Sequence, residues 1–144
     1  AAIIAVGPLR FSDKYYRASE MADLHLKYYE EAKALVDAGE GGRIIQTEFP
    51  NPGGIFTAEV HIDRHCSEHY DICVQYTDQI KCPLLVLTGT EEKHPRMLDV
   101  GKDMAALVGS KNPGFSWVHV EGGDHGLHSF EDRFNKEVMV FLGA

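Results

Sequence analysis

Ile80-Lys-Cys-Pro-Leu-Leu-Val-Leu-Thr-Gly89 and Phe115-Ser-Trp-Val-His-Val-Glu-Gly-Gly-Asp-His125 are the two stretches that decide the fold. In the first, Leu84 to Thr88 is an apolar run closed by a glycine, which is typical of a strand buried on both faces of a parallel sheet. In the second, Phe115 to Val120 predicts another strand. A helix is predicted over residues 96–108, between the two. Strand, helix and strand with a long crossover indicate an α/β fold with parallel strands.

The same pattern continues toward both ends of the chain. Ala1 to Val6 is an apolar run closed by Gly7-Pro8, and it predicts a third strand that is also buried on both faces. Because this strand starts at residue 1, we expect the chain to be part of something longer. After His125, Ser129 is expected to open a last helix, with Asp132 at the capping-box spacing. The apolar face of that helix would consist of Phe130, Phe134, Val138 and Phe141.

The intervening residues 12–78 have a different character. Residues 12–38 are predicted to be helical, with one apolar stripe at three- and four-residue steps, formed by Met21, Leu24, Tyr28, Ala32 and Leu35. Ser19 could cap the main helix and Gly39 could end it. The further predictions are a short strand within residues 43–49, a turn at Asn51-Pro-Gly-Gly54 and helical pieces over residues 57–76.

Composition limits the classes of partner. The formal net charge is −8, from 14 basic and 22 acidic side chains. This balance argues against nucleic acid or an anionic membrane as the main partner, because both favour clustered Lys and Arg. The three cysteines, Cys66, Cys73 and Cys82, are irregularly spaced. They indicate free thiols in a reducing compartment, and we predict a cytoplasmic protein.

Two side chains stand where an α/β protein places its chemistry. His125 follows a predicted strand and a Gly-Gly-Asp turn, at the carboxyl edge of the sheet. An imidazole there can exchange protons near neutral pH. Glu92 follows the strand at 84–88, so its carboxylate would lie at the same edge and could orient His125. Glu91 is the neighbouring candidate for the acid.

These segments resemble the closing half of the α/β-hydrolase fold. The stretch from Ile80 to Gly89 looks like the family's strand leading to the acid turn, and Val118 to His125 looks like its strand leading to the catalytic histidine. Residues 1–11 and 79–144 would then belong to the hydrolase core, and residues 12–78 would form the helical cap inserted in it. The resemblance implies a serine hydrolase that cleaves an ester or amide through an acyl-enzyme, with no metal or organic cofactor.

The chain departs from the family in two respects. Its acid turn carries Glu where Asp is usual, a variant that triads accept. More importantly, no Gly-x-Ser-x-Gly nucleophile motif occurs in these residues, whose serines are Ser12, Ser19, Ser67, Ser110, Ser116 and Ser129. In the family the chain order is nucleophile, acid, base, so the nucleophile would lie upstream. We therefore expect a fragment or one chain of a split protein, with a companion polypeptide that carries the nucleophile.

Three other classes of function remain open. His61, His65 and His69 have the spacing of one helix face and, together with Cys66, could bind zinc; His119, His125 and His128 form a weaker cluster. A thiol enzyme could use Cys66, Cys73 or Cys82 as its nucleophile. A noncatalytic binding module could keep the fold without the reaction.

Overall fold

The computed structural model describes residues 1–50, 52–92 and 95–143. The chain divides into two compact units. The first, which we call the sheet unit, comprises Ala1–Arg10 and Ile72–Ala144. The second, the helical unit, comprises Phe11–Asp71. Asn51, predicted to lie in a turn, is outside the described residues.

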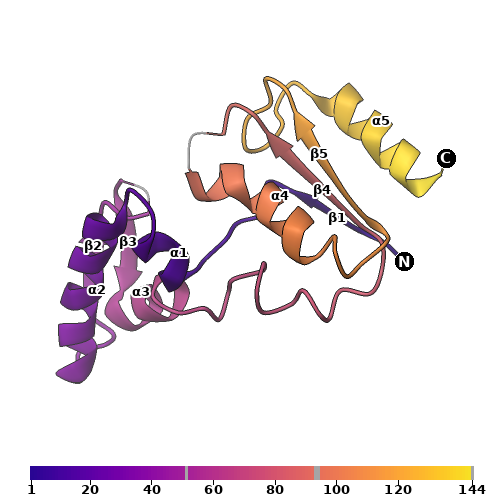
Figure 1. Ribbon diagram of the computed structural model, residues 1–144. Coiled ribbons are helices and arrows are strands. Elements are labelled where there is room, and N and C mark those ends of the chain that lie inside the picture. The colour runs from indigo at the N-terminus through magenta and orange to yellow at the C-terminus, as the bar shows by residue number, and fades with distance from the viewer. Residues whose placement is uncertain (51, 93–94, 144) are drawn as a thin grey trace. The chain divides into compact units, whose positions relative to one another are not determined.

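The sheet unit is a parallel sheet with a helix on each face. Its strands are β1 (Ile3–Val6), β4 (Leu84–Gly89) and β5 (Phe115–Val120), in the order β1-β4-β5, and both pairings are parallel. Helix α4 (Pro95–Leu107) connects β4 to β5, and α5 (Glu131–Leu142) follows β5. Figure 1 shows the three strands side by side with α4 and α5 on opposite faces. The predicted α/β arrangement with parallel strands is therefore confirmed for this unit.

The central strand β4 is buried along its whole length because each face meets a different helix. Leu84 and Val86 pack with α4 in a cluster that includes Val100 and Met104. The alternate residues on β4 pack against Phe134, Val138 and Phe141 of α5. This alternation is the expected result of the two-residue period of a strand. The apolar face predicted for the last helix is thus confirmed.

Strand β1 differs from its prediction. It was expected to be buried on both faces, but Ile3, Ile4 and Val6 are 44%, 37% and 39% exposed. The physical reason is that β1 is an edge strand of the described sheet and pairs only with β4. An edge with exposed aliphatic side chains is a surface on which another strand could pair.

In its described residues, the helical unit combines three helices with a hairpin. Its elements are α1 (Asp13–Arg17), α2 (Ala22–Asp37), β2 (Ile44–Thr47), β3 (Gly54–Thr57) and α3 (Ala58–His65). The two strands pair antiparallel. The strand predicted within residues 43–49 is confirmed. Strand β3 was missed because it has only four residues and begins at the last glycine of the Pro-Gly-Gly turn, which is too short a stretch to reveal a period. Of the helical pieces predicted over 57–76, only α3 is a regular α-helix.

The apolar stripe of α2 forms the core of the helical unit. Tyr28 packs in a cluster with Tyr16 and Phe49, and Ala32 packs with Ile45 and Ala58. The three- and four-residue spacing thus predicted the buried face correctly. None of the described helices combines the length and apolar character that crossing a membrane requires.

Two predicted caps are wrong. Helix α2 begins after Met21, and the Ser19 hydroxyl instead donates to the carbonyl of Tyr16, at the end of α1. Helix α5 begins at Glu131 with Phe130 as its N-cap residue and no side-chain cap. Ser129 has a positive φ of 65°, so it belongs to the preceding turn and cannot occupy the extended N-cap conformation.

We predict that Leu87→Ala destabilises the sheet unit strongly, because Leu87 is fully buried on β4. The expected loss is about 2–5 kcal/mol of the free energy of unfolding. Urea unfolding followed by fluorescence of Trp117, the one tryptophan, would measure it. Val140→Ala is the control, since Val140 is 68% exposed and should change stability by no more than about 0.5 kcal/mol. Equal losses in both variants would contradict the assignment of Leu87 to the core.

Candidate active site

The loops that follow β4 and β5 meet at one edge of the parallel sheet. The two strands end in register, with Gly89 beside Val120. Three hydrogen bonds then join the loops. The Thr90 N–H donates to the Val120 carbonyl at 3.0 Å, and the Glu91 N–H donates to the Gly123 carbonyl at 2.8 Å. The Gly122 N–H donates to the Thr90 hydroxyl oxygen at 2.8 Å. Backbone bonds therefore fix the loop after β4 against the loop after β5.

These loops bring His125 and Glu92 together. The imidazole Nδ1 of His125 lies 2.8 Å from Oε2 of Glu92. A carboxylate only accepts hydrogen bonds, so Nδ1 carries the proton and Nε2 is left as the basic nitrogen. The Glu92 side chain is 9% exposed and that of His125 is 48% exposed. The geometry is thus a mostly buried carboxylate that orients a solvent-accessible imidazole.

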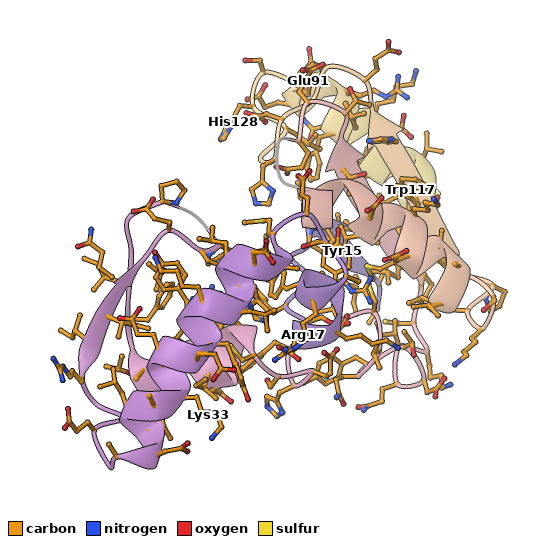
Figure 2. All side chains as sticks on the ribbon, turned by 60° about the vertical axis from the view of Figure 1, so that its left-hand side comes forward. Tyr15, Arg17, Lys33, Glu91, Trp117 and His128 are labelled. Carbon is orange, nitrogen blue, oxygen red and sulfur yellow. The ribbon has the colours of Figure 1, made fainter. Side chains whose placement is uncertain are left out.

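Glu91, the other candidate acid, is exposed on the same turn. Figure 2 shows Glu91 and His128 among the loops of the unit that holds the parallel sheet, with Trp117 elsewhere in that unit. The contact to His125 comes from Glu92. Of the two glutamates that the sequence left open, Glu92 is therefore the one that contacts His125.

Gly7, at the carboxyl end of β1, provides the space for the imidazole. A Cβ atom on Gly7 would lie 2.5 Å from the carbonyl oxygen of His125 and 2.9 Å from its ring atom Cε1. Gly7 also has a positive φ of 49°, which favours glycine. Sequence reasoning treated Gly7 only as the end of a strand. Its contact with a residue more than a hundred positions away left no local signal.

The other histidines near this edge have separate partners. Nδ1 of His128 lies 2.8 Å from Oδ2 of Asp124, and that bond raises the pKa of the His128 imidazole. His119 stacks on Trp117, with its Nε2 3.2 Å from the Gly89 carbonyl oxygen. The three histidines that could have formed a weak metal site thus face different groups.

A metal site, and Cys66 as a nucleophile, gain no support in the part of the chain that the structure describes. There, no group of three or more His, Cys, Asp or Glu side chains could hold a metal ion. In the predicted zinc segment, His61 and His65 are buried whereas His69 is exposed. Burial is the main cause that raises the pKa of the Cys66 thiol to about 12, so it remains protonated and is a poor ligand or nucleophile at neutral pH.

A hollow of about 300 Å³ lies beside the His125 loop. Its lining combines the exposed end of β1, at Val6, with residues of the turn and helix that follow His125, namely Gly126, Leu127, His128, Glu131 and Phe134. The hollow is mostly apolar with two charged or polar side chains. It therefore offers, next to the residues that follow His125, a face on which an apolar group could lie.

Comparisons with known proteins find similarity to solved structures only. No protein-family model matches the chain, and no curated protein matches it. Among solved structures, the crystal structure of E-2-(acetamidomethylene)succinate hydrolase is similar over 99% of this chain, with a TM-score of 0.47 and 15% sequence identity. The match covers 57% of that chain, so this chain spans little more than half the length of the structure that it matches.

The contact between His125 and Glu92 predicts the tautomer of the imidazole. At a pH where His125 is neutral, the proton should reside on Nδ1, and Glu92→Ala should shift it largely to Nε2, the form that isolated histidine prefers. Long-range proton–nitrogen NMR correlations of the ring measure this ratio. Glu91→Ala is the matched control and should leave the ratio unchanged. A tautomer that responds to Glu91 and not to Glu92 would contradict the geometry.

Proposed function

We propose that the chain is the C-terminal portion of a serine hydrolase that cleaves an ester or amide bond through an acyl-enzyme. In this proposal His125 is the general base and acid, and Glu92 is the acid of the triad that orients it. The observation that carries the proposal is the 2.8 Å contact between Nδ1 of His125 and Oε2 of Glu92 at the carboxyl edge of a parallel sheet. This contact leaves Nε2 of a half-exposed imidazole as a base.

The chemistry needs a serine hydroxyl that residues 1–144 do not present in a Gly-x-Ser-x-Gly motif. Nε2 of His125 would take the hydroxyl proton as the serine oxygen attacks the substrate carbonyl carbon. The imidazolium would then give that proton to the leaving alkoxide or amine. A water molecule would repeat the sequence and release the acid. Throughout, the Glu92 carboxylate would stabilise the imidazolium through the Nδ1–H bond.

A companion polypeptide or chain segment that carries the nucleophile is part of the proposal. Two features of the sheet unit support it. Strand β1 is an edge with exposed Ile3, Ile4 and Val6. The apolar hollow that begins at Val6 continues beside the His125 loop. A strand added at β1 would therefore end next to the imidazole, where a nucleophile is required.

The helical unit would serve as the cap in this proposal. The resemblance places residues 12–78 in the cap, and residues 11–71 form a compact unit of their own. Within that unit a hollow of about 480 Å³ is lined by Phe11, Val60, Asp63, Arg64 and Tyr70. Hollows of this size and mixed lining suit small organic molecules, which supports a small-molecule ester or amide as the substrate.

We predict that His125→Ala in the complete protein lowers kcat for short-chain aryl esters by about a thousandfold or more, because the serine would lose its base. His119→Ala is the control, since His119 is exposed, stacks on Trp117 and does not line the hollow beside the His125 loop. It should retain activity within a few-fold. Steady-state kinetics on samples with matching circular dichroism would measure both. Intact turnover in the His125 variant would refute the assigned role.

A second prediction concerns the missing nucleophile. A fluorophosphonate probe should label native material on a serine outside residues 1–144, and intact mass should detect that polypeptide or chain extension. The expressed 144-residue chain alone should remain unlabelled. Labelling of one of its own serines would contradict the companion. Absence of labelling and of ester turnover in the complete native material would favour a noncatalytic binding module.

A further inference from the structure

Three histidines form part of the core of the helical unit, and the proposed reaction uses none of them. His25 on α2, and His61 and His65 on α3, are 0%, 0% and 1% exposed. Their rings pack against one another and against aromatic side chains. The contacts of His61 place its ring centroid 5.2 Å from His65 and 5.9 Å from Phe56. Histidine is usually only partly buried, so three fully buried histidines in one small core are unusual and indicate a specific role.

His61 has the least polar surroundings of the three. Both of its ring nitrogens are buried and lack a hydrogen-bond partner among the described residues. Besides His65 and Phe56, its ring contacts are Tyr28 and Phe49, both with centroids 6.4 Å away. A neutral imidazole can remain there at some cost, but an imidazolium would be a buried charge with no partner.

The charged groups of the unit are arranged around His25. Nε2 of His25 lies 2.8 Å from Oδ1 of Asp13 on α1, and the Arg17 guanidinium donates to Oδ2 of the same carboxylate at 2.7 Å. Figure 2 shows Arg17 on α1 beside α2, where its guanidinium lies over the ring of Tyr29. Asp13 therefore already has two cationic or potentially cationic partners.

The titratable neighbours of His61 are two histidines and a tyrosine. Helix α2 contributes His25 and Tyr28, and α3 contributes His65. Strand β3 and the segment after β2 contribute the rings of Phe56 and Phe49, which do not titrate. Asp13 and Arg17 of α1 act electrostatically on His25. None of these contacts supplies a carboxylate to the His61 ring.

These surroundings make the helical unit less stable in acid. Burial, and then the charge of His25, lower the pKa of His61 to about 4 from its ordinary value of 6.5. Burial also lowers the pKa of His25, although Asp13 opposes it. The unfolded unit therefore binds more protons below pH 6.5. For each such histidine, the equilibrium constant for unfolding rises about tenfold for every unit by which the pH falls. This rise applies between the pKa of the unfolded state and the lower pKa of the folded state.

We propose that this histidine core makes the helical unit an acid-triggered switch, which unfolds on mild acidification while the sheet unit remains folded. The sheet unit offers the contrast. Its described histidines, His119, His125 and His128, are all exposed. The pKa of His128 is raised by Asp124, which favours the folded state in acid. The proposal does not rest on the proposed function, since it concerns residues that the proposed reaction does not use.

The two units have separate optical probes. All tyrosines except Tyr76 lie within residues 11–71, whereas the one tryptophan, Trp117, lies in the sheet unit. On titration of the full chain from pH 7.5 to 4.5, the near-ultraviolet circular dichroism of tyrosine should be lost between pH 6.5 and 4.5. Trp117 fluorescence should persist over the same range. Loss of both signals together, or of neither, would overturn the proposal.

His61→Leu tests whether the buried imidazole causes the transition. The variant should move the midpoint to lower pH by about one unit, because it removes a proton-binding group of the unfolded state. His69→Leu is the matched control, since His69 is exposed next to α3, and it should leave the midpoint unchanged. Equal shifts in the two variants would overturn the proposal.

Two measurements on the unaltered chain guard against a variant that fails to fold. In NMR titration, the ring C–H signal of His61 should show no protonation in the folded state down to pH 5. Protonation of His61 near pH 6.5 in the folded state would overturn the proposal. The circular dichroism titration should also be unchanged by EDTA. If EDTA alone at pH 7.5 abolished the tyrosine signal, loss of a bound metal would be the cause and the proposal would fail.

Discussion

The parallel pairing of β4 with β5 is the constraint on which the candidate site depends. Gly89 and Val120 end the pairing side by side, and backbone bonds continue from the strands into both loops. A hydrogen bond or ion pair at a partly exposed position contributes only about 0–1 kcal/mol. The contact between His125 and Glu92 therefore cannot hold the loops in place. The buried strands hold the loops, and the loops bring the imidazole to the carboxylate.

The sequence predicted correctly those elements in which the same residues both suit the local backbone conformation and pack in the core. Strand β4 is an apolar run, which suits a strand covered on both faces. The side of α5 that packs against the sheet is recognisable because it carries phenylalanines. The burial of β1 was predicted wrongly because an apolar run shows what a strand is suited to pack against, not what lies beside it. The predictions that Ser19 and Ser129 cap helices were wrong because serine is also favoured in turns, and both serines lie in turns.

The candidate site was predictable in outline only. That His125 and a glutamate of the earlier turn lie at one edge follows from parallel strands, whose loops leave from the same end. Whether Glu91 or Glu92 contacts His125 depends on the backbone path of a short turn. The two residues have the same side chain, so the sequence does not distinguish them. The role of Gly7 depends on a contact between distant residues, which no local pattern encodes. The sequence therefore predicted the topology, but it did not predict where individual side chains point.

Burial decides what an imidazole can do in this chain. His125 has a carboxylate on one nitrogen and a half-exposed side chain, which is the arrangement that the proposed proton transfer requires. His61 is surrounded by aromatic rings and lacks a polar partner, so only the neutral form is accommodated. The one-turn spacing of His61 and His65 correctly predicted that they share a helix face, but the zinc interpretation assumed that this face was open to a ligand. Because the face is packed against Phe49 and Phe56 instead, the same spacing links the folding of the helical unit to proton concentration.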